Sequence, residues 1–519
     1  MEIVFLTANV IFFLISFSFA IIDFLHYFQL NSYHYGMQIK WMFMNYSKLV
    51  IHIIIFLFGL LLLRFDSNFA LIVLPVIFLI SILINKPKKA KKPLVYTNRI
   101  KRIIISISIL VLIVVLAAIC LKINSLEYVI LGMLILYLLA PVLVLLGNFI
   151  NTPIESVIKR YYINDAKKIL RFSNELIIIG VTGSYGKTSL KYYLNTILKA
   201  KYNVLMTPES YNTPMGVVKT IRNSLNATHQ IFICEMGAKK VGEIKEICDI
   251  VHPKHGIITA IGPQHLETFK SLENIQKTKF ELADALPSDG LLFLNIDDKN
   301  ITSHKSERPF VSYGVQGHGE YAVSNLKLSN IGTTFTVKKL NGEVCDFSTK
   351  LIGSHNVLNI VGAIAIANQL GIELSQIRTQ VKKIEGVPHR LQLINKGKDL
   401  IIDDAFNSNP NGAAAALETL NLFDGFKILI TPGMVELGSK QAEYNYSFGK
   451  NAATVCDYVV IVGTTNKDSI LNGLEDSGFL QQKIYLAKTI QNALNQINLV
   501  QSNGQNKIIL LENDLPDNF

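Results

Sequence analysis

IIIGVTGSYGKTS, residues 177–189, is a run of β-forming residues that ends in a glycine-rich turn and a Lys-Thr pair. Gly180, Gly183 and Gly186 are spaced by three, so the backbone can adopt positive φ angles and bring its N–H groups close to phosphate oxygens. A helix that begins near Thr188 would point its positive end at the same anion. The pattern predicts a phosphate-binding loop between a buried strand and a helix.

The residues of this loop indicate ATP as the ligand. Lys187 can reach the β- and γ-phosphates as a point charge, and the Thr188 hydroxyl can bind the Mg²⁺ that accompanies the nucleotide. The spacing G-x-x-G-x-x-G-K-T departs from the usual G-x-x-x-x-G-K-[ST], because Val181 stands at the first glycine of that pattern. A glycine-rich turn without a ligand is the alternative. The predicted nucleotide-binding residues of the loop are Gly183, Ser184, Gly186, Lys187, Thr188 and Ser189.

The part of the chain before residue 151 has a different composition. Half of the 519 residues are hydrophobic, and the apolar excess is concentrated there. Five runs are long or apolar enough to be membrane spans: residues 3–22, 49–63, 69–84, 103–121 and 128–150. The first run follows only Glu2, without a basic region or a cleavage site, so we expect a retained helix and not a signal peptide. Buried core helices are the alternative, which the number of runs and their near absence of charge disfavour.

A basic segment between the third and fourth runs predicts the topology. It carries eight cations: Lys86, Lys88, Lys89, Lys91, Lys92, Arg99, Lys101 and Arg102. Such segments stay in the cytoplasm, and two further crossings return the chain to that side. We therefore expect a multi-pass protein of the plasma membrane with a cytoplasmic ATP site. Because these cations account for most of the net charge of +11, the charge indicates topology and anionic lipid, and no nucleic-acid partner is expected.

From residue 172, short apolar runs alternate with helical stretches, which predicts an α/β fold with a parallel sheet covered by helices. Binding residues are expected at the carboxyl ends of the strands. The expected strands are 176–179, 204–206, 230–234, 256–260 and 291–294, followed by a β-rich edge at 308–350 and a helix at 353–371. The alternation of apolar runs and helical stretches begins again near residue 386, with expected strands at 400–402, 427–430, 458–462 and 507–511.

This pattern predicts three domains. The first, residues 1–150, is an α-helical membrane domain. The second, residues 172–385, is a P-loop domain with a parallel sheet. The third, residues 386–519, is a smaller Rossmann-like domain.

Three further candidates lie in the second domain. Glu235 follows a buried strand, where a carboxylate can hold the magnesium ion of a nucleotide, although an acid at a helix N-terminus is the alternative. His265 follows another strand, and a lone histidine is more often structural. Lys279 falls on a helix, where a lysine is ordinarily solvated. Each is a weak signal by itself.

Taken in order, eight motifs resemble those of the Mur ligases. They are GVTGSYGKT, EMGAKKVGEI, IGPQHLETFKSLENIQKTKFEL, LNIDD, GSHNVLNIVGA, GVPHRLQLI, DDAFNSNP and GMVELG. The closest likeness is to the type that adds D-alanyl-D-alanine to a UDP-muramoyl tripeptide, and it covers about residues 172 to 480. The resemblance implies ATP-dependent amide-bond synthesis, in which the acceptor carboxylate attacks the γ-phosphate and an amine then displaces phosphate from the acyl phosphate.

The resemblance also implies roles for individual residues. Lys187 and Thr188 would hold phosphate and magnesium, and Glu235 and His265 would be metal ligands. Lys279 matches the lysine that is carbamylated in this family, a change that turns a cation into an anion able to bind a second Mg²⁺. Lys187, Lys279 and His265 would thus be the catalytic side chains.

Other matches concern the nucleotide. His355, Asn356 and Asn359 match the H-N-x-x-N segment that contacts it, with Asn295 nearby. From the third domain, Arg390 and Asp404 match residues that reach across to the ATP. The N-x-N-P segment is matched by Asn407 and Asn409. A site shared by two domains implies closure on substrate.

The chain also departs from the family. Apolar runs occupy the place of the N-terminal domain that recognises the UDP-sugar. Phe406 replaces a tyrosine, Gly433 replaces an acid, and the C-terminal Lys-Gly-Ser segment is lacking. We therefore expect a carboxylate acceptor presented at the membrane, on a lipid or an envelope polymer, and an amino acid or dipeptide as the amine.

Two functions are compatible with these observations. The first is a membrane-anchored ATP-dependent ligase of cell-envelope biosynthesis, such as the making of peptidoglycan. The second is a non-catalytic or regulatory ATP-binding membrane protein with a degenerate ligase fold. The presence of Lys187, Glu235, His265 and Lys279 favours the first.

Overall fold

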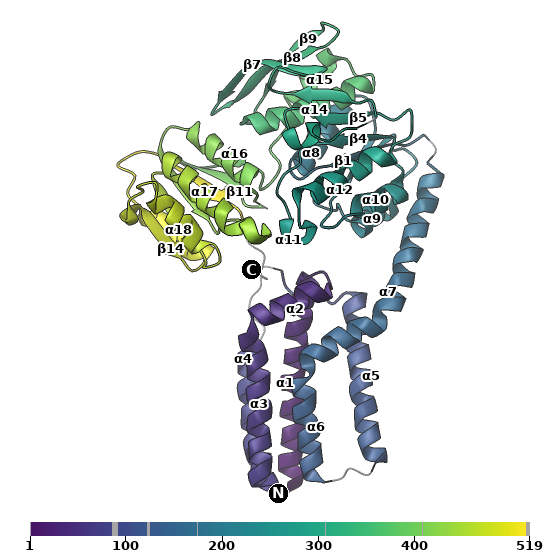
Figure 1. Ribbon diagram of the computed structural model, residues 1–519, viewed down its shortest axis with the longest axis vertical. Coiled ribbons are helices and arrows are strands. Elements are labelled where there is room, and N and C mark those ends of the chain that lie inside the picture. The colour runs from purple at the N-terminus through teal and green to yellow at the C-terminus, as the bar shows by residue number, and fades with distance from the viewer. Residues whose placement is uncertain are drawn as a thin grey trace. The chain divides into compact units, whose positions relative to one another are not determined.

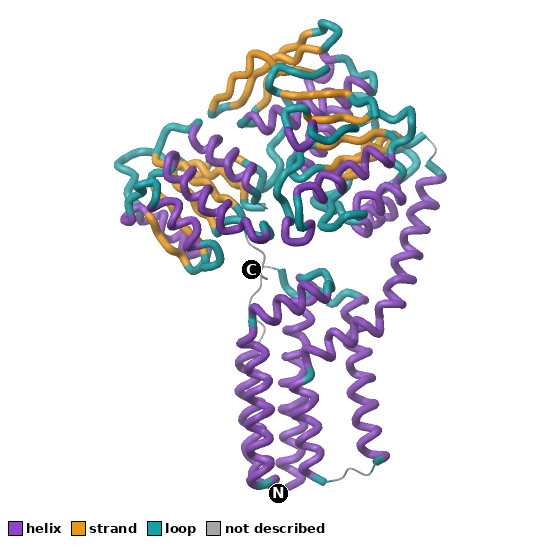
Figure 2. The backbone as a smooth tube through the Cα atoms, viewed as in Figure 1, coloured by secondary structure: helices purple, strands orange, loops and turns teal. Residues whose placement is uncertain are grey.

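The computed structural model describes residues 2–85, 92–121, 125–173, 175–306, 308–406 and 408–514. Contacts within the chain divide it into two compact units, one that runs to Arg160 and one that begins at Tyr161. The described part of the first unit is helical, and the second contains two sheets (Figures 1 and 2). The helical N-terminal region and the α/β region that the sequence predicts are both present.

Long apolar helices build the first unit. Its elements are α1 (Glu2–Leu30), α2 (Tyr35–Met44), α3 (Tyr46–Phe65), α4 (Ser67–Asn85), α5 (Asn98–Cys120), α6 (Leu126–Leu138) and the first part of α7 (Ala140–Arg171). In the described part of the chain, α1, α3, α4, α5 and α7 are long and apolar enough to cross a membrane. The prediction of five such helices is confirmed, and the short helix α2 is an addition to it.

The fifth expected run, residues 128–150, is wrong as a single helix. It is divided between α6 and α7, with Leu139 between them. Pro141 in the first turn of α7 explains the break, because in a continuous helix its ring would clash with the preceding turn and its nitrogen could not donate. Beyond the expected end, α7 continues to Arg171, since Ala166 is fully buried against the second unit's core.

The basic segment is only partly described. Lys86, Lys88, Lys89 and Lys91 lie outside the described residues. Two of the remaining cations contact groups of the same unit. The Arg99 guanidinium lies 3.8 Å from the centre of the Tyr33 ring, and the Arg102 guanidinium lies 2.6 Å from the Glu155 carboxylate.

A nine-stranded sheet forms the first half of the second unit. Its strands are β1 (Ile177–Thr182), β2 (Val204–Met206), β3 (Ile231–Glu235), β4 (His255–Ile258), β5 (Leu292–Asn295), β6 (Val311–Gly314), β7 (Tyr321–Ser329), β8 (Gly332–Lys339) and β9 (Val344–Thr349). The order is β2-β3-β1-β4-β5-β6-β7-β8-β9, parallel as far as β7 and antiparallel beyond it. β1 lies between the parallel strands β3 and β4, so the loop that follows it lies at the carboxyl edge of the sheet.

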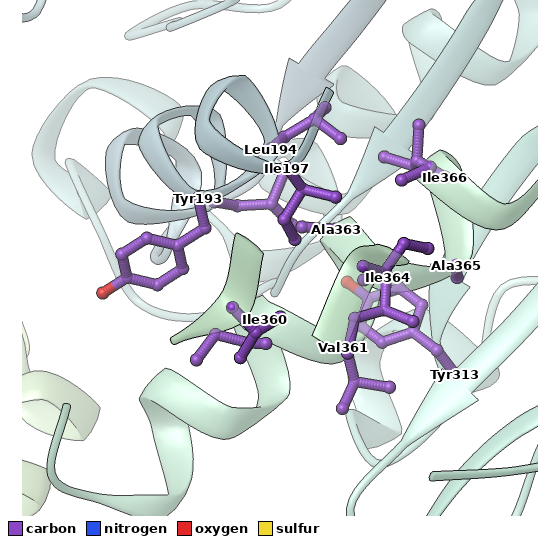
Figure 3. Packing of buried hydrophobic residues seen from close by; sticks show 14 of the residues in the cluster. Tyr193, Leu194, Ile197, Tyr313, Ile360, Val361, Ala363, Ile364, Ala365 and Ile366 are labelled. Atoms are coloured by element: carbon purple, nitrogen blue, oxygen red, sulfur yellow. The ribbon is translucent and has the colours of Figure 1, made fainter. Parts of the chain in front are cut away.

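Helices cover both faces of this sheet. On one face, α8 (Lys187–Leu198), α14 (Ser354–Gln369) and α15 (Leu374–Val381) build a core of buried aliphatic residues with Tyr193 and Tyr313 (Figure 3). On the other face lie α9 (Pro214–Ser224), α10 (Glu243–Val251), α12 (Leu272–Ala285) and the end of α7. The glycine-rich loop therefore lies between two packed layers.

A second sheet follows, with the order β10-β11-β15-β12-β13-β14. Its strands are β10 (Gln392–Lys396), β11 (Asp399–Asp404), β12 (Phe426–Thr431), β13 (Tyr458–Val462), β14 (Ile484–Ala487) and β15 (Lys507–Glu512). The helices α16 (Pro410–Asn421), α17 (Gln441–Val455) and α18 (Lys467–Glu475) pack on one face, and α19 (Ile490–Leu499) packs on the other. The four expected strands are present; β10 and β14 were not expected.

Candidate active site

The loop between β1 and α8 has the backbone that its glycines predict. Gly183 and Gly186 have φ angles of +151° and +78°. A Cβ atom at Gly183 would lie 2.1 Å from the Thr259 hydroxyl, and one at Gly186 would lie 2.5 Å from the Asn359 side-chain oxygen. Any larger residue would strain the loop at both positions.

Lys187 is folded back over this loop. Its ammonium group donates hydrogen bonds to the carbonyl oxygens of Gly183 at 2.7 Å and Ser184 at 3.1 Å. Burial lowers the pKa of Lys187 to about 8, while Glu235 raises it and Arg390 lowers it further. The group is thus held at the loop, close to other charges, where an anion would stabilise its charged form.

Ser184 and Ser189 lie on either side of the Lys-Thr pair. The Ser184 hydroxyl donates to the carbonyl oxygen of Gly262 at 3.1 Å, and its backbone N–H donates to Ala260. These bonds tie the loop to the segment after β4. Ser189 is half-buried in the first turn of α8.

Glu235 ends β3, the strand next to β1, and its side chain is 1% exposed. Its Oε1 accepts hydrogen bonds from the Thr188 hydroxyl at 3.2 Å and the Asn212 amide at 2.9 Å. Its Oε2 lies 2.9 Å from the Lys191 ammonium. Burial raises the pKa of Glu235, but Lys191, Lys187 and the hydrogen bonds outweigh it, so the net shift is downward.

Lys279 is buried, contrary to the expectation of a solvated lysine. It lies on α12 with 2% of its surface exposed. Among the described residues, none makes a hydrogen bond or an ion pair with its ammonium group. Burial, and after it the charge of Lys187, lower its pKa well below the usual value. The neutral form of this side chain is therefore favoured more than in an exposed lysine.

His265 begins the short helix α11 (Leu266–Phe269) with a φ of +51°. Its Nδ1 bonds to the carboxylate of Glu436, which also lies 3.2 Å from the Lys239 ammonium. Burial lowers the pKa of His265, against the effect of Glu436. The bond joins the first half of the unit to the loop after β12.

The metal ligands that the resemblance implies are only partly brought together. Thr188 and Glu235 are in contact, and their oxygens are of the kind that magnesium prefers. The Nδ1 of His265 is occupied by Glu436. In the part of the chain that the structure describes, no group of three His, Cys, Asp or Glu side chains could hold a metal. A magnesium site here would therefore depend on Thr188, Glu235 and oxygens of the nucleotide.

The predicted nucleotide contacts on α14 and β5 are buried or half-buried. Burial lowers the pKa of His355 to about 4, so its imidazole is neutral at pH 7. Asn356 accepts from the Tyr193 hydroxyl at 2.7 Å, and Asn295 donates to the Thr259 carbonyl at 3.0 Å. Asn359 lies against Gly186. Asn359 therefore lies against the loop itself, whereas Asn356 and Asn295 bond to Tyr193 and Thr259.

Arg390 and Asp404 come from the second half of the unit. Arg390 lies over the Phe406 ring, 4.5 Å from its centre. Burial lowers the pKa of Arg390, while Asp404 and Glu235 oppose the shift. Burial raises the pKa of Asp404 to about 6, against the effect of Arg390. Arg390 thus interacts with charges on both halves.

The N-x-N-P segment has a structural role in its described part. Asn407 lies outside the described residues. Asn409 caps α16, where its side chain accepts from the Gly412 N–H at 2.8 Å. This cap fixes the start of the helix that follows β11.

Lys191 and Asn212 were missed by the sequence analysis. One signal was available for Lys191: it lies four residues after Lys187, between the buried Leu190 and Leu194, where an aliphatic residue would be expected on the core face of α8. A charged residue at such a position requires a buried partner. No comparable signal marks Asn212.

Comparison with known proteins identifies the family. Residues 181–367 match the family model of the Mur ligase middle domain, and residues 389–511 match that of the Mur ligase glutamate ligase domain. The two matches together cover more than half of the chain. The chain therefore belongs to the Mur ligase family, of which it carries the middle and C-terminal domains.

Several relatives share one description. The UDP-N-acetylmuramoyl-tripeptide–D-alanyl-D-alanine ligase of Bacillus subtilis is 30% identical over 275 residues, which are 52% of this chain and 59% of the relative. The ligase of the same description from Escherichia coli is 29% identical over 292 residues, 55% of this chain and 64% of the relative. The chain thus spans about three fifths of the length of these relatives.

Among solved structures, MurF from Acinetobacter baumannii is similar, with a TM-score of 0.62 and 27% identity. The likeness covers 69% of this chain and 77% of that one. The residues that match the two family models all lie in the second unit.

Proposed function

We propose that this protein is an ATP-dependent ligase that joins a carboxylate to an amine in cell-envelope synthesis. The proposal rests on the geometry of the glycine-rich loop, where the Lys187 ammonium donates to the carbonyl oxygens of Gly183 and Ser184 and the Thr188 hydroxyl lies 3.2 Å from Glu235. Such a site can hold a nucleotide and stabilise negative charge that develops during phosphoryl transfer. The names of the relatives support this reaction class.

The proposed chemistry has two steps. An oxygen of the acceptor carboxylate attacks the γ-phosphorus of ATP, the bond to the bridging oxygen breaks, and ADP leaves. The amine nitrogen then attacks the acyl carbon, and phosphate departs as the amide forms. Lys187 and Arg390 stabilise the charge on the phosphate oxygens in both steps.

Thr188 and Glu235 would hold the magnesium ion that accompanies the nucleotide. When bound, this ion offsets negative charge on the phosphates. Asn212 donates to Glu235 at 2.9 Å and orients the carboxylate without adding charge.

Lys279 fits a carbamate-forming role. A neutral buried amine can attack CO₂ and lose a proton, which gives a negatively charged carbamate. Burial and Lys187 lower the pKa of Lys279 well below the usual value, which favours the neutral amine that reacts with CO₂. The resulting anion would lie close to Lys187 and offset the repulsion between the two lysines.

The helical first unit supports a membrane location. We propose that α1, α3, α4, α5 and α7 cross the plasma membrane, with the nucleotide site in the cytoplasm and the acceptor carboxylate on a lipid-linked or polymeric envelope precursor. The soluble pair implied by the relatives, a UDP-muramoyl tripeptide with D-alanyl-D-alanine, is the competing choice of substrates.

Nucleotide binding tests the site directly. The full chain should bind a fluorescent ATP analogue in the presence of magnesium, and Lys187→Ala should weaken that binding at least about tenfold, since it removes a charge-assisted contact. Lys199→Ala, an exposed lysine just after the same helix, is the matched control and should bind normally. Equal binding by both variants would contradict the assignment of the loop.

A non-catalytic protein would also pass this test. The distinction lies in turnover: a regulatory protein would bind ATP without releasing ADP when acceptor and amine are supplied. The buried Lys279 favours the ligase, because nucleotide binding alone gives no reason to bury an unpaired lysine beside the loop.

A further inference from the structure

Lys191 is a second buried lysine near the phosphate loop. It lies on α8, one turn beyond Lys187, and its side chain is 0% exposed. Its ammonium group lies 2.9 Å from Oε2 of Glu235 and donates to the carbonyl oxygen of Glu209 at 2.5 Å. Unlike Lys279, it has two partners for its charge within the protein, the Glu235 carboxylate and the Glu209 carbonyl oxygen.

A buried ion pair of this kind is unusual on the core face of a helix. Removing two charges from water is costly, and an aliphatic pair of the same volume is often as stable. Removing one partner alone leaves the other as an uncompensated buried charge. The pairing therefore makes Glu235 a carboxylate that keeps its negative charge although it is 1% exposed.

The two oxygens of Glu235 have different surroundings. Oε2 faces Lys191, whereas Oε1 accepts from Thr188 at 3.2 Å and Asn212 at 2.9 Å. Thr188 belongs to the phosphate loop, and Asn212 to the segment after β2. Because Oε2 lies beside the Lys191 ammonium, the ion pair favours the orientation of the carboxylate that keeps Oε1 on the side of the loop.

The segment after β2, residues 207–212, is held by the same lysine. Glu209 has a φ of +41°, and its carbonyl oxygen accepts from Lys191. At the ends of the segment, Thr207 accepts from the backbone N–H of Glu235 at 3.1 Å, and Asn212 accepts from that of Gly237 at 2.8 Å. Lys191 therefore connects three elements that meet at Glu235: α8, β3 and this segment.

We propose that Lys191 is a positioning residue that fixes the Glu235 carboxylate and the 207–212 segment, so that Oε1 and the Thr188 hydroxyl are presented together to a magnesium nucleotide. This inference rests on the proposed function, and it adds a residue that acts through Glu235. Groups that orient a metal ligand in this way affect metal affinity about 10- to 100-fold when they are replaced.

The test measures the magnesium dependence of nucleotide binding by the full chain. Lys191→Met keeps the volume and removes the charge. The Mg²⁺ concentration at half-maximal binding of a fluorescent ATP analogue should rise at least about tenfold. Lys191→Arg keeps the charge and should recover part of the loss, and Lys199→Met, an exposed lysine just after α8, should bind as the unmodified protein does.

A double variant separates positioning from packing. In a Glu235→Gln background the carboxylate is absent, so adding Lys191→Met should change the magnesium dependence less than about twofold, because coupled residues are non-additive. The double variant also leaves no unpaired buried charge, and it should fold even if Lys191→Met does not.

Three outcomes would overturn the inference. One is an unchanged magnesium dependence in Lys191→Met together with a lower melting temperature, which would mean a packing role only. Another is an equal effect of Lys191→Met in both backgrounds. The last is an unmodified protein that binds no nucleotide at any Mg²⁺ concentration, and only this outcome contradicts the proposed function as well.

Discussion

Lys279 has the most unusual environment among the site residues. Its pKa in the folded protein is far below the ordinary value of 10.5, because burial and Lys187 disfavour the charged form. Between the lowered pKa of the folded protein and 10.5, the unfolded chain binds more protons than the folded one, so the free energy of unfolding rises with pH. At pH values below the lowered pKa, the buried charged lysine destabilises the fold.

A neutral replacement should remove this penalty. Lys279→Met, measured by chemical unfolding in CO₂-free buffer, should be more stable than the unmodified protein at pH 7. The difference should shrink as the pH approaches 10.5, where the unfolded lysine also loses its proton. A constant difference across this range would contradict the low pKa.

The proposed catalytic role of the same residue requires a separate measurement. Lys279→Ala should lose ligase activity, and short-chain carboxylates should restore part of it, because they can replace the oxygens of the carbamate. Lys277→Ala, on the same helix, is the control and should stay active. Full activity of Lys279→Ala without added carboxylate would mean that the lysine has no part in catalysis.

Residue patterns predicted the backbone of the glycine-rich loop, but not the residues that pack around it. Gly183 and Gly186 are recognisable in the sequence because a turn of this kind requires positive φ angles. Lys191 and Asn212 meet Glu235 only through tertiary packing. Their roles depend on which strands are neighbours, which no local pattern contains.

The end of β15 carries a buried carboxyl group, Glu512, that should make the stability of the second sheet depend on pH. Glu512 is 0% exposed and accepts hydrogen bonds from Ser408 after β11 and from Thr431 at the end of β12. Burial raises its pKa from 4.5 to about 7, against the effect of these hydrogen bonds. The carboxyl group thus joins the carboxyl ends of three neighbouring strands.

Because its pKa is raised in the folded protein, Glu512 should make the free energy of unfolding decrease as the pH rises. Between pH 4.5 and about 7 the folded state binds the proton and the unfolded state does not, so the free energy of unfolding decreases by about 3 kcal/mol. Glu512→Gln should remove that decrease, as measured by urea unfolding at several pH values. Parallel pH profiles for the two proteins would contradict the raised pKa.

The elements themselves were predicted unevenly. Strands such as β13 follow directly from apolar runs of β-branched residues. The break between α6 and α7 was missed, because hydropathy continues through it and only Pro141 marks it. β14, at the edge of the sheet, was missed although its four residues Ile484–Ala487 are apolar or aromatic.

For the whole molecule, the main question is what the helical unit contributes. Five long apolar helices are more than an anchor requires. If they present a lipid-linked acceptor, a fragment from about residue 151 should keep nucleotide binding and show a higher KM or no activity with that acceptor. The comparison uses detergent-solubilised acceptor with both proteins. Equal kcat/KM would contradict a role in substrate presentation.

Amide-bond formation coupled to ATP cleavage is the proposed activity of this protein. The most direct test incubates the full chain with ATP, Mg²⁺, one carboxylate acceptor and one amine, and measures ADP, phosphate and amide product together. The acceptors include a UDP-muramoyl tripeptide and a lipid-linked muramoyl peptide, and the amines include amino acids and D-alanyl-D-alanine. We predict equal amounts of ADP, phosphate and amide with at least one pair, dependent on both substrates and lost in Lys187→Ala. Binding of ATP with no amide formed from any of the tested pairs would contradict the proposed ligase activity.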